Sequence, residues 1–222
     1  MSHFYKFGTK DIYDEAQIVR PAVSLVGNEM FFDPVFNPPT ENGVYIKYTD
    51  GSYSAGDKLI AGKTPVGVAF KNNLVAFTIH PDEGGKIWTQ NTDTVISGVT
   101  TTTDVNVAKV DYKGKDNTDA VLASGLVNNN SAFYWATKLA FKDHSRGWLP
   151  SCGEMEQIRL NAEDINAAME LIGGTPVDFS SKYYWSSTQY SAGGSWRWDT
   201  NLSSWANGLK NRNLFCRSVS AF

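Results

Sequence analysis

The sequence predicts an α+β protein, because strand-like segments come first, helical segments follow, and strands return at the end of the chain. The early segments alternate apolar and polar residues with period 2, which is typical of half-buried strands. The middle segments place apolar residues at 3.6-residue spacing behind helix-capping residues. With 222 residues, 41% hydrophobic and 19% charged, the chain can bury a substantial core as one large domain or two small ones.

The first part of the chain divides into an irregular arm and a strand-rich segment. Residues 1–40 have little periodicity and several prolines, with short strands expected only at 18–19 and 23–26. From Gly43 the alternation becomes regular, and Asp50-Gly51 is a turn signal. We expect a small antiparallel sheet over 43–80. A further strand is expected at 105–110.

Helical segments in the middle of the chain have recognisable start and stop signals. Ser151 and Glu154 form an S-x-x-E capping box, in which each side chain accepts a hydrogen bond from a backbone N–H at the helix start. The next helix should end at Gly173-Gly174. A short turn capped by Asn117-Thr118 and an amphipathic helix capped by Ser131 precede them. Strands then return at about 183–188, 195–200 and 214–221.

Charge and motif content argue against several function classes. A formal net charge of −3 provides no basic surface for nucleic acid or anionic membranes, and no apolar run approaches the length of a membrane span. The histidines, His3, His80 and His144, are scattered without metal or base partners, and neither H-E-x-x-H nor G-x-S-x-G occurs. We therefore expect no catalysis, no metal site, no cofactor and no membrane insertion.

Two further observations concern export and redox chemistry. Residues 1–15 lack the charged n-region and apolar h-region of a secretory signal, which predicts either export without one, as in a virion, or a trimmed sequence. Cys152 and Cys216 make no disulfide framework. One disulfide between them is possible, but two buried thiols are favoured.

Residues 183–222 have the composition of a recognition surface. Aromatic residues alternate with Asn and Ser, and rigid aromatics among short polar residues are typical of paratopes. We predict that the middle of this segment binds a ligand through exposed tryptophans, although alternation in a strand must turn about half its side chains to the core. A polar, loop-rich surface is the competing interpretation. The candidate ligand-binding residues are Tyr190, Trp196, Arg197, Trp198, Asp199, Asn201, Ser203, Ser204, Trp205, Asn207, Asn211 and Asn213.

Four motifs follow one another in the second half of the chain: D-Y-K-G-K-D-N-T from Asp111, W-L-P-S-C-G-E from Trp148, Y-W-S-S-T from Tyr184 and R-S-V-S-A-F from Arg217. In this combination they resemble bacterial and phage domains that are similar to C-type lectin folds. Several of those domains are variable proteins of diversity-generating retroelements, the class that includes the tropism determinant of a phage tail.

The resemblance implies a C-type lectin-like fold with short antiparallel strands and two main helices over 111–222. An attachment arm (1–40) and a strand-rich part (41–110) would precede it. Three motif segments are expected to be structural: the Trp148 plug and turn, the Trp185 strand, and Arg217 in a buried pair or bound to backbone.

In such retroelements the 3′ end of the gene is rewritten at adenines. Asn codons of the form AAY then yield many residue types but never Glu, Gln, Lys or Met, and residues 190–216 contain none of these except Lys210. Trp requires a different starting codon, so the tryptophans are either fixed or of that origin. Cys216 falls in the segment expected to vary, which argues further against a disulfide.

The implied function is ligand or receptor binding through a variable region, 183–222, without catalysis. The implied partner is a protein or glycan on a host-cell surface, and the setting is a phage tail or a bacterial cell surface. A homo-oligomer would add avidity to weak single contacts. The alternative is a structural or assembly surface domain of the same family that does not diversify.

Overall fold

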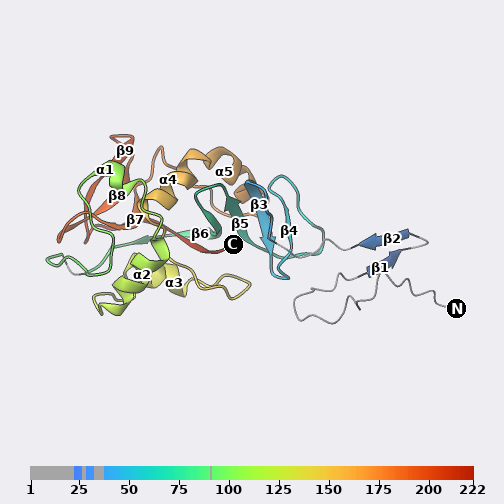
Figure 1. Ribbon diagram of the computed structural model, residues 1–222, viewed down its shortest axis with the longest axis horizontal. Helices are drawn as coiled ribbons and strands as arrows, with labels where there is room; N and C mark the ends of the chain where they lie inside the picture. The colour runs from blue at the N-terminus through green and yellow to red at the C-terminus, as the bar shows by residue number, and fades with distance from the viewer. Residues whose placement is uncertain (1–22, 27–28, 33–37, 91) are drawn as a thin grey trace, which may run out of the picture.

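The computed structural model describes residues 23–26, 29–32, 38–90 and 92–222, which form an α+β fold as predicted (Figure 1). Strands β1 (Val23–Val26) and β2 (Glu29–Phe32) pair with each other as an antiparallel two-stranded sheet, so the strand expected at 23–26 is confirmed. The strand expected at 18–19 lies outside the described residues. Eight further strands form a single, mostly antiparallel sheet in the order β4-β3-β5-β6-β10-β7-β8-β9.

The N-terminal half of this sheet is the antiparallel unit predicted over 43–80. It contains β3 (Gly43–Tyr48), β4 (Tyr53–Ala55), β5 (Pro65–Lys71) and β6 (Ala76–Lys86). The turn between β5 and β6 is held by Asn72, whose side-chain oxygen accepts hydrogen bonds from the backbone N–H groups of Leu74 and Val75. Asparagine favours turns because its side chain can bond the backbone two residues ahead.

The C-terminal half contains β7 (Tyr184–Gln189), β8 (Gly194–Asp199), β9 (Ser204–Leu209) and β10 (Leu214–Ala221). Strand β10 lies between β6, to which it is antiparallel, and β7, to which it is parallel. One sheet therefore crosses the sequence boundary expected at residue 110. Strand β9 was not predicted, because its Asn and Gly are poor strand formers and only its register with β8 makes it a strand.

Five helices cover the two faces of the sheet: α1 (Val105–Ala108), α2 (Gly114–Ala123), α3 (Ala132–Lys138), α4 (Cys152–Leu160) and α5 (Ala162–Leu171). Helices α4 and α5 lie over one face, and α2 and α3 over the other (Figure 1). Two apolar cores result, one centred on Met155 and Ile165, the other on Phe133 and Trp185.

Two helix predictions need correction. The strand expected at 105–110 is wrong, because Asp104 caps a one-turn helix there by accepting a hydrogen bond from the Asn106 N–H at 2.8 Å. The description with two main helices is incomplete. In particular, Asn117 lies inside α2 and does not cap it, since its side chain is used in tertiary hydrogen bonds. The stop at Gly173 is confirmed, and this glycine has the positive φ of 72° expected after a helix end.

A buried carboxylate, Asp111, joins three of the four motifs. Its Oδ2 accepts hydrogen bonds from Asn117 Nδ2 at 2.9 Å and from Thr188 Oγ1 at 2.7 Å. Its Oδ1 accepts one from Thr100 Oγ1 at 3.1 Å, and its backbone carbonyl accepts one from Ser151 Oγ at 2.6 Å. Asp111 is only 5% exposed, so these bonds replace the water that the carboxylate loses on folding.

The predicted capping box at the start of α4 is confirmed. Glu154 Oε2 accepts from the Ser151 N–H at 2.9 Å, and Ser151 Oγ accepts from the Glu154 N–H at 3.4 Å. The indole N–H of Trp148 donates to the same carboxylate oxygen at 3.3 Å. Burial raises the pKa of Glu154 to about 7 despite these bonds, because desolvation disfavours the charged form.

Arg217 and the cysteines behave as the structural prediction requires. The Arg217 side chain is fully buried, pairs with Glu83 at 3.1 Å and donates to the backbone carbonyls of His80 and Pro81. Cys152 and Cys216 are free and buried in cores on opposite faces of the sheet, so they form no disulfide.

Replacing Asp111 by Ala should lower the free energy of unfolding by at least about 3 kcal/mol, because several buried donors lose their acceptor together. Urea denaturation measures the change. Asp119→Ala is the matched control, since this carboxylate pairs with Lys115 and Arg146 at a partly exposed site and should cost roughly 1 kcal/mol or less. Equal losses in the two variants would show that the Asp111 network does not stabilise the fold.

Glu154 predicts a pH dependence of stability. Its pKa is about 7 in the folded chain and 4.5 when unperturbed, so between these values the folded chain binds more protons than the unfolded chain. The free energy of unfolding should therefore fall as pH rises from about 4.5 to about 7, by up to about 3 kcal/mol.

The variant Glu154→Gln isolates this contribution, because glutamine keeps a side-chain acceptor for the cap but does not titrate. Urea denaturation at several pH values from about 5 to about 8 should give a flatter profile for Glu154→Gln than for the parent chain. Parallel profiles would mean that Glu154 titrates at its ordinary pKa in the folded chain.

Candidate ligand-binding surface

The three tryptophans expected to be exposed anchors are buried, which corrects that prediction. Trp196, Trp198 and Trp205 are 4%, 6% and 4% exposed and belong to the core beneath α4 and α5. Trp198 and Trp205 are direct cross-strand partners, so they project from the same face of the sheet. Their rings meet edge to face at 5.9 Å, and Arg159 of α4 lies 4.9 Å above the Trp198 ring.

Each buried indole also donates a hydrogen bond. Trp196 Nε1 donates to the carbonyl of Thr102 at 2.8 Å, and Trp198 Nε1 donates to that of Phe179 at 2.7 Å. Trp205 Nε1 donates to Glu156 Oε2 on α4 at 2.8 Å. The tryptophans therefore fasten two loops and a helix to strands β8 and β9, and none has a free donor for a ligand.

The remaining candidate residues divide by exposure. Tyr190, Arg197 and Ser204 are half-buried and Asp199 is buried, while the others lie at the surface. In the fully described stretch 190–216, the exposed residues are Asn201, Leu202, Ser203, Asn207, Leu209, Asn211, Arg212, Asn213 and Phe215. The surface of this segment is thus made mainly of short polar and aliphatic side chains together with Arg212 and Phe215, and its tryptophans lie beneath.

A polar pocket of about 320 Å³ opens in this surface. It brings together four of the candidate residues, Arg197, Asp199, Asn201 and Asn207. Five residues that the sequence did not single out complete it: Tyr183, Gly208, Leu209, Arg212 and Leu214. Most of these lie on or beside β9, so recognising that strand and its register with β8 would have identified them.

Arg197 is the central side chain of this pocket. Its Nη2 pairs with Asp199 Oδ2 at 2.8 Å, and its guanidinium lies 4.8 Å from the Tyr183 ring centre. The side chain can lie flat across β9 only because residue 208 is glycine, since a Cβ there would come within 2.5 Å of Arg197 Cδ. Asp199 also accepts hydrogen bonds from the Asn201 and Leu202 N–H groups, which fixes the turn after β8.

Lys210 is the one residue of 190–216 that belongs to the set Glu, Gln, Lys and Met, and its side chain is fully buried. Its Nζ donates to the Thr94 carbonyl at 3.0 Å and to Gln189 Oε1 at 2.9 Å, and lies 4.8 Å from the Trp88 ring centre. Burial lowers the pKa of Lys210 to about 8. This lysine belongs to the core and contributes nothing to the exposed surface.

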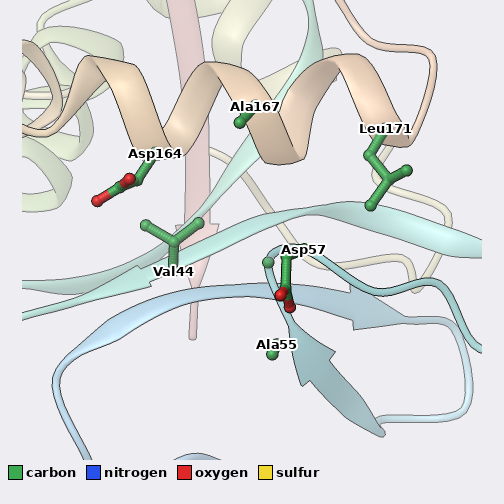
Figure 2. A pocket seen from close by; sticks show the side chains of 7 residues that line it. Val44, Ala55, Asp57, Asp164, Ala167 and Leu171 are labelled. Atoms are coloured by element: carbon green, nitrogen blue, oxygen red, sulfur yellow. The ribbon is translucent and has the colours of Figure 1, made fainter.

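A second hollow, of about 510 Å³, lies between α5 and strands β3 and β4. Figure 2 shows Asp164, Ala167 and Leu171 on the helix and Val44 and Asp57 on the facing strand and turn. None of its lining residues belongs to the segment 183–222. No motif or residue pattern in the sequence predicts this hollow.

The site residues can form hydrogen bonds, ion pairs and apolar contacts with a ligand. Across 38–90 and 92–222, together with the two short strands that precede them, His, Cys, Asp and Glu nowhere gather in a group of three that could hold a metal. None of the described helices combines the length and apolarity needed to cross a bilayer. The polar pocket presents two guanidinium groups, a carboxylate and amides.

The burial of the tryptophans leads to a stability prediction. Trp198→Ala and Trp205→Ala should each lower the free energy of unfolding by about 3 to 5 kcal/mol, because each leaves a cavity and an unpaired acceptor. Urea denaturation measures the loss, with Asn207→Ala at an exposed position of β9 as a control expected to change stability by about 0.5 kcal/mol or less. Unchanged stability in the tryptophan variants would contradict the burial of these two side chains in the core.

Comparison with known proteins is informative at the level of structure. No protein-family model and no curated protein matches this sequence. Among solved structures, the chain is similar to a fimbrial protein from Bacteroides ovatus, with a TM-score of 0.61 and 15% sequence identity. The similarity covers 82% of this chain and 49% of the other, so this chain spans about half the length of that protein. At this level of identity the likeness concerns the fold alone.

Proposed function

We propose that this chain is a ligand- or receptor-binding protein whose C-terminal surface is diversified, and that it performs no catalysis. In this proposal residues 111–222 are a C-type lectin-like domain of the retroelement variable-protein class. The partner is a protein or glycan on a host-cell surface, and the protein belongs to a phage tail or a bacterial cell surface. One observation carries the proposal, namely how burial divides residues 190–216.

Within 190–216, burial separates the residue types that adenine mutagenesis of AAY codons can produce from those that it cannot. The types that it cannot produce occur only at Trp196, Trp198, Trp205 and Lys210, and all four residues are buried. Every exposed residue of this stretch is Asn, Ser, Leu, Arg or Phe, all of which AAY codons can yield.

The rest of the chain does not follow this division. Exposed residues before 183 include lysines and glutamates such as Lys58, Lys115, Glu163 and Glu170. Lysine and glutamate are normally common on protein surfaces. Their absence from the exposed positions of 190–216 is what mutagenesis confined to AAY codons would produce.

The proposed mechanism separates a fixed frame from a variable surface. The frame consists of the buried tryptophans, Lys210, Arg217 and the Asp111 network, whose substitution would destabilise the fold. Exposed positions tolerate substitution with little change in stability, so they can vary while the fold persists. Affinity then comes from whichever side chains occupy the exposed positions and the polar pocket.

The C-type lectin-like assignment is supported by the way the family's motifs meet. Asp111, Ser151 and Thr188 belong to three different motifs and are joined by direct hydrogen bonds. Thr188 Oγ1 also accepts from the Cys152 N–H at 2.9 Å, which attaches the start of α4 to β7. Residue types that build one buried network are expected to recur together in a family, as these motifs do.

The alternative is a structural or assembly domain that does not diversify. The observation in its favour is the fold similarity to a protein named as fimbrial. In that case the exposed face of β8 and β9 would contact neighbouring subunits. The two functions predict different amounts of variation at the 3′ end of the gene, which allows a direct test.

Sequencing the 3′ end of the gene in many individual cells or virions distinguishes the two functions. Diversification should give substitutions at the codons of exposed residues such as Asn201, Asn211 and Asn213, with the codons of Trp198 and Lys210 unchanged. A nearby near-repeat that differs only at adenines, beside a reverse transcriptase gene, should accompany them. An invariant 3′ end without such a repeat would leave the assembly domain as the function.

A further inference from the structure

The polar pocket carries a local positive charge in an acidic chain. The whole sequence has a net charge of −3, whereas the pocket contains two guanidinium groups, of Arg197 and Arg212, and one carboxylate, of Asp199. Asp199 is neutralised by its ion pair with Arg197 and accepts two backbone hydrogen bonds. Among the residues that the structure describes, no carboxylate lies within ion-pairing distance of Arg212, which is exposed. One positive charge is therefore available to an anion.

Arg197 also has unused hydrogen-bonding capacity. Its Nη1 is buried and has no hydrogen-bond partner among the described residues, although Nη2 pairs with Asp199. An unpaired buried donor is unfavourable, and a guanidinium binds a carboxylate best through two parallel N–H groups. Arg197 lines the pocket beside Gly208, so a carboxylate that enters the pocket could supply an acceptor for this guanidinium.

The rest of the lining indicates what surrounds that carboxylate. Asn201 and Asn207 contribute amide groups, and Asp199 contributes acceptor oxygens, all of which suit hydroxyl groups. Leu209 and Leu214 add a small apolar wall. The volume of about 320 Å³ is at the lower end for small-molecule sites and suits a single ring.

We propose that this pocket binds an acidic monosaccharide unit of a surface glycan, with the sugar carboxylate on Arg197 and Arg212 and the ring hydroxyls on the amides and Asp199. The inference rests on the proposed ligand-binding function and names the ligand class of the same surface. The Asp or Glu side chain of a peptide is the competing anion. It would occupy the guanidinium groups but leave the amides around them without partners.

The test uses the full chain and three small probes followed by ligand-observed NMR titration. Methyl β-D-glucuronide carries both the carboxylate and the hydroxylated ring. Methyl β-D-glucoside keeps the ring without the carboxylate, and N-acetyl-L-glutamate amide keeps the carboxylate without the ring. The glucuronide should bind at least about tenfold more tightly than either of the other two probes, because only it satisfies both halves of the pocket.

Variants locate the binding. Arg212→Gln, at an exposed position that should not affect folding, should weaken glucuronide binding about tenfold or more. Arg197→Gln should do the same, and a thermal melt shows whether it remains folded. Arg146→Gln is the control, since this exposed arginine pairs with Asp119 away from the pocket, and it should leave binding unchanged.

Several results would overturn the proposal: no glucuronide binding, equal binding of the glucoside or the glutamate amide, or undiminished binding by Arg212→Gln. Failure here is distinguishable from failure of the proposed function. If the 3′ end of the gene varies as expected but the glucuronide does not bind, only the ligand class is wrong. If the glucuronide binds through Arg212 while the 3′ end is invariant, the sugar site stands and diversification does not.

Discussion

The buried Asp111 carboxylate is the constraint on which the rest of the structure depends. A carboxylate that is almost entirely removed from water is tolerable only if its oxygens are all hydrogen-bonded. Its donors come from the loop before α1, from α2 and from β7, while its own backbone carbonyl accepts from the residue that caps α4. Satisfying one charge therefore fixes the relative positions of elements on both faces of the sheet. This explains why separate motifs of short polar residues are structural.

Buried hydrogen bonds also position the C-terminal strands, because they hold the large side chains of these strands inside the core. Strands β8 and β9 present their tryptophans to α4 and the adjoining loops, and each indole N–H has a defined acceptor. The opposite face of β8 carries Arg197 and Asp199, which pair with each other beside an open pocket. A hairpin anchored this firmly on one face can change the side chains on its other face and at its turns without losing its position. The buried tryptophans and the Arg197–Asp199 ion pair thus lie on opposite faces of the hairpin.

Much of the fold could be predicted from local signals, whereas the site could be predicted only in part. The capping box at Ser151 and the stop at Gly173 were found because they depend on neighbouring residues alone. Strand β9 and the exposure of Trp198 depend on cross-strand register, which composition does not reveal. Alternating valines favour a strand at 105–110, whereas the Asp104 cap makes 105–108 a helix. Arg212 lines the pocket only because of the tertiary structure, so its place there could not be predicted from the sequence.

Lys210 shows most clearly how the fixed frame reaches into the segment proposed to vary. A buried lysine without a carboxylate partner is unfavourable, and here it is held by the Thr94 carbonyl, the Gln189 amide oxygen and the face of Trp88. Gln189 also accepts from the Ile96 N–H, so the same amide ties β7 to the loop before α1. A residue that fills this position must carry a long donor side chain, and few other residues satisfy that requirement. The lysine lies in the turn that presents Asn211 and Arg212 to solvent, so its burial would hold the surface proposed to vary at a constant place on the sheet.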